Sequence, residues 1–176
     1  MATVPLYDAT IGVANHSLLT LLDLLQLAQA HPDAASLPKA RLAEDMLPFS
    51  TQIQIVSDFS KKFVERLTGR ELEVWENNEE TLEQLIARVE KTIALLKTVK
   101  REDVDNASRT QTIKMGPFDP VSATMEQYLF GYAQPNLLFH LSTAYLILRH
   151  KGFELGKAVL LKHFVGDFFT GVQTAK

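Results

Sequence analysis

Four segments of the chain carry apolar residues at intervals of three and four, and this spacing constrains the fold more than any other feature. Such spacing places the apolar side chains of a segment on one face of an α-helix. The segments cover roughly residues 8–30, 48–68, 79–98 and 135–150. No unit of about 20–50 residues repeats, which argues against a solenoid. The pattern therefore predicts an all-α four-helix bundle.

Local signals mark the ends of these helices. Pro48 suits the first turn of the second helix, and Gly69 lies where a glycine commonly ends one. Asn77 and Glu80 have the spacing of a capping box, so we expect them to begin the third helix.

Residues 99–124 break the helical pattern. Side chains of Thr110–Met115 alternate weakly between polar and apolar, and Gly116–Pro120 is rich in turn-forming residues. We expect a small β-hairpin or extended excursion between the third and fourth core helices. Beyond it, Pro135 should interrupt or kink the turns that lead into the fourth helix, and Gly152 should end that helix.

The first helix has apolar residues on two sides. Its predicted core stripe consists of Ile11, Ala14, Leu18, Leu21, Leu22, Leu25 and Ala28. Leu19, Leu24 and Leu27 fall outside this stripe and would form an exposed patch unless something covers them. The apolar segment 158–169 or a second subunit could provide the cover. We favour the second subunit, and therefore a homodimer.

Composition limits the classes of function. The 176 residues include no cysteine, which excludes disulfides, zinc–thiolate sites, iron–sulfur clusters and a cysteine nucleophile. The net charge of −3 provides no overall basic surface for nucleic acid. No apolar run approaches the roughly 18 residues that span a bilayer, and no basic residue precedes Lys39. We expect one cytoplasmic domain over residues 1–176, without membrane or nucleic-acid contacts.

The most distinctive stretches of the chain lie in and after the last core helix, namely Pro135–His140, Thr143–Gly152 and then Gly156–Lys157. Three earlier stretches agree with them: Tyr7–Asp8, Arg41–Met46 and Gln52–Phe59. Together they resemble a domain-of-unknown-function family in the DinB/YfiT-like superfamily, over nearly the whole chain. The resemblance implies a four-helix bundle that is often paired as a dimer. It implies no established reaction.

The wider superfamily also implies a divalent metal site of three histidines, two of them in a His-x-x-x-His pair on the last core helix. His150 matches the second residue of that pair, but Leu146 occupies the first position and has no donor atom. His140 and His150 lie about 15 Å apart along a helix, too far to share one ion. We therefore expect no metal and no other cofactor.

His140 and Tyr145 are the candidate catalytic residues. Ala144 and Ile147 lie beside His140 on a helix that is apolar around most of its circumference, which suggests a buried or half-buried imidazole. Such a group can act as an acid or a base, with Tyr145 as a second proton-transfer group. The competing interpretation, which the pattern favours, is a core histidine satisfied by one hydrogen bond.

Arg149, His150 and Asp58 are the candidate ligand-binding residues. Tyr145 and Arg149 are one helical turn apart, and with His150 they could hold an anionic or carbonyl-bearing ligand. The alternative is a structural clamp, in which Arg149 pairs with a carboxylate and His150 closes the helix C-terminus. Asp58 lies opposite the apolar stripe of its helix, so it should face solvent or a neighbouring element.

The stretch 71–90 is rich in glutamate, and Arg88 is its one basic residue. Acidic side chains are favoured near a helix N-terminus, so we interpret this stretch as a solvated face.

We therefore expect a DinB-like bundle protein that binds a small ligand or a partner between its helices, without an intact three-histidine metal site. The alternative is a divergent enzyme that uses His140 and Tyr145, as a transferase, a hydrolase or a metal-free acid–base catalyst. An enzyme should show His140 in a concave pocket where other polar groups converge. A binding or structural protein should show His140 packed and satisfied.

Overall fold

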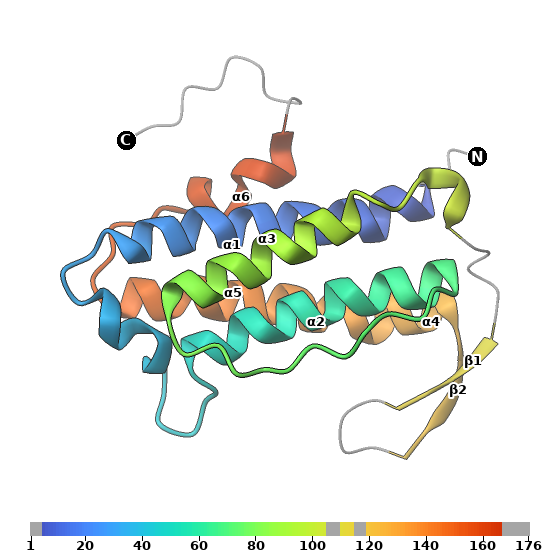
Figure 1. Ribbon diagram of the computed structural model, residues 1–176, viewed down its shortest axis with the longest axis horizontal. Coiled ribbons are helices and arrows are strands. Elements are labelled where there is room, and N and C mark those ends of the chain that lie inside the picture. The colour runs from blue at the N-terminus through green and yellow to red at the C-terminus, as the bar shows by residue number, and fades with distance from the viewer. Residues whose placement is uncertain (1–4, 105–109, 115–118, 167–176) are drawn as a thin grey trace.

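The computed structural model describes residues 5–104, 110–114 and 119–166, and most of them are helical (Figure 1). The long helices are α1 (Val13–Gln29), α2 (Phe49–Thr68), α3 (Leu82–Leu96) and α5 (Gln134–His150). Shorter elements are the helices α4 (Met125–Tyr128) and α6 (Lys157–Val165), the 3₁₀ segments η2 (Ala34–Lys39) and η3 (Arg101–Asp103), and the π-helical segments η1 (Asp8–Gly12) and η4 (Leu129–Ala133).

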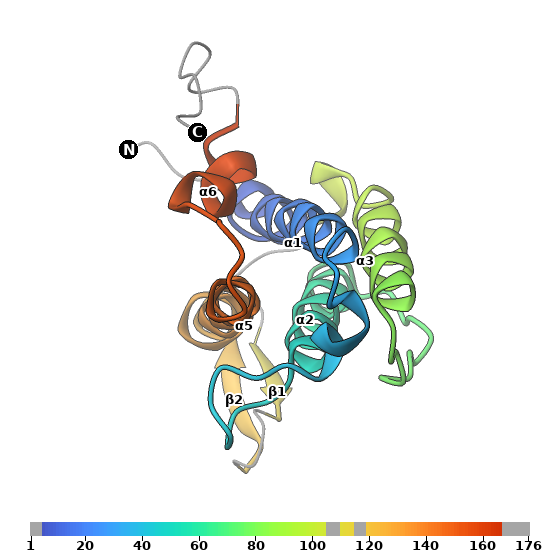
Figure 2. The ribbon, with the colours of Figure 1, turned by 90° about the vertical axis from the view of Figure 1, so that its left-hand side faces the viewer.

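The four long helices form the predicted bundle. Helix α2 packs against α3 and α5, while α1 packs against α3, α5 and α2 (Figures 1 and 2). The stripe predicted for the second helix is fully buried: Phe49, Ile53, Val56, Ser60, Phe63 and Leu67. The all-α fold class predicted from the spacing is therefore confirmed.

The prediction for Leu24 was wrong, because this residue is completely buried in the core. Helix α1 contacts α2, α3, α5 and α6, so its buried arc is wider than a stripe that faces one neighbour. Leu19 is partly buried against the core, and Leu27 alone of the three is exposed. The patch expected on this helix is therefore largely absent.

Helix α6 lies along the outer side of α1 (Figure 2). Thr20 donates a hydrogen bond to the Leu160 carbonyl over 3.4 Å. The Asp23 carboxylate pairs with Lys162 at 2.8 Å and with His163 at 3.0 Å. The apolar segment after residue 157 thus packs on the first helix, which is the alternative to the second subunit that we favoured from the sequence, although residues 167–169 lie outside the described part of the chain.

The N-terminal helical run Asp8–Gln29 is long and apolar enough to cross a membrane by length and composition. Half of its most apolar window is buried inside the bundle. This is the packing of a core helix.

Most of the predicted helix ends are confirmed. Pro48 precedes the first residue of α2 with an extended backbone, and Gly69 ends this helix in the left-handed conformation with φ of 72°. The predicted start of the third helix was wrong, because the capping box is formed by Thr81 and Gln84. Thr81 is still extended, so helical hydrogen bonding begins only after it, and Asn77 instead donates to the Asp58 carboxylate.

The excursion after the third helix contains the expected hairpin. Strands β1 (Thr110–Ile113) and β2 (Val121–Thr124) pair antiparallel, with Thr110 opposite Thr124. Arg66 of α2 donates to Gln111 over 3.2 Å and so ties the hairpin to the bundle. Most of the predicted turn at residues 116–120 lies outside the described residues.

The last core helix begins after a local change of pitch. The π-helical segment η4 directly precedes α5, and Pro135 lies in the first turn of α5. Proline has no N–H to continue the preceding hydrogen-bond ladder, which agrees with the expected interruption at this point. Gly152, with φ of 89°, follows the end of α5 as predicted.

Candidate functional site

The seam between α2 and α5 holds a polar pair in apolar surroundings. His140 of α5 is partly buried, and its Nδ1 lies 2.6 Å from Oε1 of Gln52 on α2. The Gln52 side chain is itself buried, and its Nε2 donates to the Leu47 carbonyl over 2.9 Å. One chain of hydrogen bonds thus runs from the loop before α2 to the imidazole.

This series of hydrogen bonds determines which nitrogen of His140 carries the proton. The Leu47 carbonyl can only accept, so it must face the amide NH₂ of Gln52, and the amide oxygen then faces His140. The oxygen accepts a hydrogen bond from Nδ1–H, which leaves Nε2 with a free lone pair in the neutral ring. Within the part of the chain that the structure describes, Nε2 makes no hydrogen bond.

Burial lowers the pKa of His140 below its ordinary value of 6.5. The sequence between Glu126 and Arg149 contains no Asp or Glu that could oppose this effect from within α5 or the turns before it. His140 is therefore neutral at pH 7, and the exposed ring of Phe139 lies beside it, with the two ring centres 5.1 Å apart. A neutral imidazole of fixed orientation can accept a hydrogen bond or take up a proton.

The other candidates on α5 do not gather around His140. The Tyr145 hydroxyl donates to the Leu155 carbonyl over 2.7 Å, and Arg149 donates to the Phe153 carbonyl over 3.0 Å. Both hydrogen bonds hold the turn after α5, as in the structural clamp considered from the sequence. The partner of Arg149 in this clamp is a backbone carbonyl and not the carboxylate that was expected. His150 is exposed at the end of the helix.

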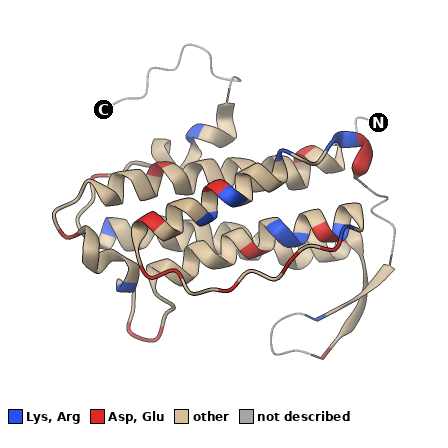
Figure 3. Cartoon of the chain, viewed as in Figure 1, with Lys and Arg blue, Asp and Glu red and all other residues tan. Residues whose placement is uncertain are grey.

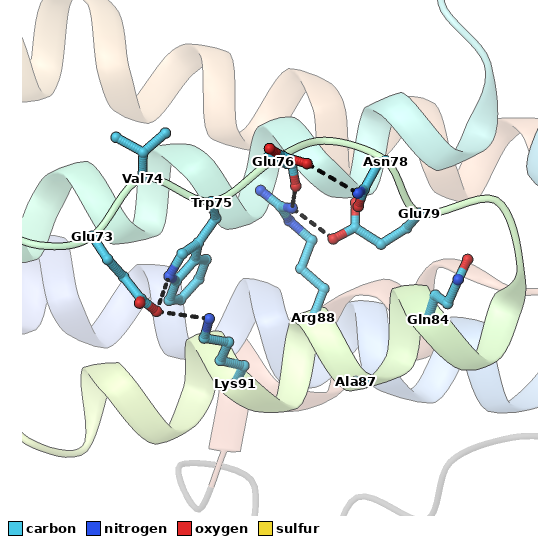
Figure 4. A pocket seen from close by; sticks show the side chains of 10 residues that line it. All are labelled: Glu73, Val74, Trp75, Glu76, Asn78, Glu79, Gln84, Ala87, Arg88 and Lys91. Carbon is cyan, nitrogen blue, oxygen red and sulfur yellow. Dashed lines mark hydrogen bonds and ion pairs between the residues drawn. The ribbon is translucent and has the colours of Figure 1, made fainter.

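Asp58 turns toward a neighbouring element, as its position on the helix allowed. Its carboxylate accepts from Arg88 of α3 over 2.7 Å. Arg88 also pairs with Glu79 at 2.7 Å and donates to the Glu76 carbonyl over 2.9 Å (Figure 4). Sequence reasoning assigned Arg88 to a solvated face, and this was wrong, because the side chain is buried.

The periodicity contained a signal for Arg88. Arg88 follows Leu85 by three residues and precedes Thr92 by four, and both of these neighbours are buried. It therefore occupies the buried arc of α3. Its guanidinium holds the acidic, extended segment between α2 and α3 against both helices (Figures 3 and 4).

A cavity of about 440 Å³ lies beside this cluster and is lined by Trp75, Lys91 and Arg88 among others (Figure 4). The Lys91 ammonium lies 4.2 Å from the centre of the Trp75 ring and 2.9 Å from the Glu73 carboxylate. Trp75 also donates to Glu73 over 2.8 Å. Since these groups largely satisfy one another, the cluster is better explained as an anchor for the extended segment than as a ligand site.

A larger hollow of about 650 Å³ lies at the base of the hairpin, against the aromatic side chains of Tyr128, Phe130 and Tyr132. Few polar groups line it, and one of them, Gln127, is already bonded to the backbone of Thr124 in the cap of α4. His140 does not line this hollow or the cavity beside Arg88. The oriented imidazole at the α2–α5 seam is the candidate functional site because its Nε2 makes no hydrogen bond among the described residues, although it lines neither cavity.

No group of three or more histidine, aspartate or glutamate side chains that could hold a metal ion occurs among the described residues. Leu146, at the position where the superfamily has a ligand, is exposed.

The bundle, its hairpin and the last core helix define the class of protein as DinB-like. A crystal structure of a DinB family member from Shewanella denitrificans matches this chain with a TM-score of 0.80 and 33% sequence identity, over 89% of this chain and 91% of that chain. The model of the domain of unknown function DUF1993 matches residues 6–161, so the chain belongs to this family. The resemblance found in the sequence is confirmed. No curated protein matches the chain.

Proposed function

We propose that this DUF1993 protein binds a small molecule at the seam between α2 and α5. In this proposal the Nε2 lone pair of His140 accepts a hydrogen bond from a hydroxyl or N–H group of the ligand. The observation that carries the proposal is the hydrogen-bond chain from Leu47 through Gln52, which orients the ring and leaves Nε2 uncommitted. The exposed ring of Phe139 lies beside the imidazole and offers an apolar contact.

A matched pair of probes tests this proposal. Phenol carries a donor on an apolar ring, whereas anisole has the same ring without the donor. We expect phenol to shift the NMR signals of the His140 ring saturably and anisole to do so much less. His140→Phe should abolish the response to phenol, and His150→Gln, a change at an exposed position of the same helix, should preserve it. Equal binding of both probes, or unchanged phenol binding by His140→Phe, would contradict the proposal.

A divergent enzyme is the second candidate function, and the orientation of the His140 ring supports it, whereas the concave pocket with converging polar groups expected of an enzyme is not met by the two cavities described above, which His140 does not line. A neutral imidazole held by a hydrogen bond to Nδ1 is the arrangement of a general base. Tyr145 was the expected second group, but its hydroxyl is bonded to the Leu155 carbonyl, so the enzymatic proposal rests on His140 alone. Hydrolysis of 4-nitrophenyl acetate should then rise with pH through the pKa of His140 and be lost in His140→Phe. A rate independent of His140 would rule this candidate out.

The proposal includes no resident metal. The residues present do not fit the three-histidine site, because Leu146 stands in place of one ligand and no acidic or histidine cluster replaces it among the described residues. We expect elemental analysis of protein purified without an affinity tag to find far less than one divalent ion per chain. About one zinc or nickel ion per chain that disappears in His150→Ala would contradict this prediction. The cytoplasmic location and the absence of a nucleic-acid partner stay predictions.

The pKa of His140 gives a direct test of its environment. Burial should keep the pKa below 6.5 in the folded protein. In the unfolded chain His140 has its ordinary pKa of 6.5, so as the pH falls below 6.5 the unfolded chain takes up a proton before the folded protein does. The contribution of neutral His140 to the free energy of unfolding is therefore complete above pH 6.5 and is lost as the pH falls through the lower pKa of the folded state. NMR titration of the ring should show the lowered pKa.

Gln52→Glu should raise the pKa of His140 above the wild-type value, because a carboxylate beside Nδ1 favours the charged ring. Gln26→Glu adds the same charge at an exposed position of α1 and should leave the pKa unchanged. Equal shifts in the two variants would mean that net charge, rather than contact with residue 52, controls the ring.

A further inference from the structure

Another hollow, of about 510 Å³, lies at the end of the bundle where the first helical run begins and α3 ends (Figure 1). This volume is within the range of sites that bind small molecules. The buried side chains of Ile11 and Leu96 and the partly buried ring of Tyr7 give the hollow apolar walls. His140 does not line it. It is called the α1–α3 hollow below.

A wide helical turn forms one side of the α1–α3 hollow. Asp8, Ile11 and Gly12 belong to the π-helical segment η1, and single π-helical turns are rare and frequent at functional sites. Gly12 contributes no side chain to the hollow. A β-carbon at this position would meet only the Tyr7 carbonyl oxygen outside the adjoining helical backbone, at the ordinary contact distance of 3.7 Å. The glycine therefore leaves open a space that a side chain could occupy.

Two side chains of α1 bring uncommitted hydrogen-bonding groups to the hollow. Asn15 and His16 are both partly buried, and neither side chain makes a hydrogen bond within residues 5–104, 110–114 and 119–166. The His16 ring lies edge-on to Phe164 of α6, with the two ring centres 5.8 Å apart. Burial, together with the nearby His163, lowers the pKa of His16 below 6.5, so its ring is neutral at pH 7.

The charged residues that line the hollow are Asp8 and Lys97. The Asp8 carboxylate is already paired with Arg101, which donates to it over 2.8 Å and lies over the Tyr7 ring at 4.9 Å. The Lys97 ammonium makes no ion pair or hydrogen bond within the part of the chain that the structure describes. The α1–α3 hollow therefore combines apolar walls with one uncompensated positive charge.

We propose that the α1–α3 hollow binds a small monocarboxylate with an apolar body. The apolar body contacts Ile11 and Leu96, and the carboxylate accepts hydrogen bonds from the Lys97 ammonium and the Asn15 amide. This inference goes beyond the proposed function and does not depend on it.

The groups of the hollow favour a carboxylate over other classes of ligand. A cation would meet the charge of Lys97, and the carboxylate of Asp8 is already bonded to Arg101. A wholly apolar ligand would cover the Asn15 amide without giving it a partner, which is costly. A carboxylate offers acceptors to both free donors, and hydrogen bonds between charged groups are the stronger kind.

Benzoate and benzylamine are matched probes, because they carry opposite charges on the same apolar ring. We expect benzoate to shift the NMR signals of the His16 ring and the Asn15 amide saturably, and benzylamine to do so much less. Lys97→Met keeps most of the apolar stem and should weaken benzoate binding at least about threefold, as expected for one exposed charge contact. Lys39→Met removes an exposed lysine of η2, beyond the other end of α1, and should leave binding unchanged.

Gly12→Leu should abolish the response to benzoate, because the new side chain fills the space that the glycine leaves open. Circular dichroism should show unchanged helix content, since leucine favours a helix more than glycine does. Lys97→Met changes an exposed side chain and gives the answer by itself if Gly12→Leu disturbs the helix.

Three outcomes would overturn the inference: no saturable response of the wild-type protein to benzoate, equal responses to benzoate and benzylamine, or undiminished benzoate binding by Lys97→Met. The response of His140 to phenol should persist in Lys97→Met, because Lys97 lies on α3 side of the bundle's end and not at the α2–α5 seam. Failure of this inference is therefore distinct from failure of the proposed function.

Discussion

Replacement of Phe63 by alanine is expected to lower the free energy of unfolding by about 3–5 kcal/mol. Phe63 is completely buried in the middle of α2, the helix that packs against both α3 and α5. Its removal leaves a cavity that neighbours on two sides can fill only by partial collapse. Chemical denaturation of the wild-type protein and the variant, with the midpoint and the slope fitted for each, would measure the loss in free energy of unfolding.

Val74→Ala is the control for Phe63→Ala. Val74 is also apolar, but it is 91% exposed on the extended segment before α3. Its truncation should change the free energy of unfolding by no more than about 0.5 kcal/mol. Equal losses in the two variants would show that α2 does not occupy the centre of the bundle.

Arg88→Ala is expected to cost about 2–4 kcal/mol of stability, because it leaves two carboxylates without their cation. The side chain of Arg88 is only 3% exposed, while those of Asp58 and Glu79 are 29% and 14% exposed. Removal of one partner from a buried pair is costly, and the partial exposure of Asp58 reduces the cost because water can reach it. Denaturation at neutral pH would give the value.

Two further observations make the Arg88 prediction specific. Lys91 also lies on α3, and Lys91→Ala breaks its exposed ion pair with Glu73 of the extended segment, which should cost no more than about 1 kcal/mol. Arg88→Ala should also release the segment before α3, so proteolysis between residues 70 and 80 should become faster than in Lys91→Ala. Similar stability and cleavage in both variants would contradict the anchoring role of Arg88.

Whether a prediction from the sequence was correct depended on the neighbours of the helix concerned. The stripe of α2 from Phe49 to Leu67 was predictable because its residues face the core from one segment at fixed spacing. The same reasoning failed for Leu24, since α1 has neighbours on several sides and a single stripe underestimates its buried arc. It failed for Arg88 because an acidic sequence around a basic residue is compatible with both a solvated face and a buried ion cluster.

The sequence predicted only one of the two residues of the candidate site. The apolar surroundings of His140 indicated a half-buried imidazole, and the structure agrees. Its partner was not foreseen, because Gln52 is separated from His140 by 88 positions and belongs to a different helix. The apolar stripe of α2 could have flagged Gln52, which lies between the buried residues Phe49 and Ile53. It could not have shown what the amide contacts.

The sequence by itself determined the helical segments, most of their ends, the hairpin and the membership in a DinB-like family. These properties depend on spacing, on turn-forming residues and on motifs within one stretch of chain. Only the tertiary structure decided that Gln52 orients His140, that Arg88 joins Asp58 to Glu79, and that α6 covers α1 while the face of α5 stays open. Each of these depends on which faces of separate helices meet, and periodicity identifies the apolar face of a helix without specifying its partner.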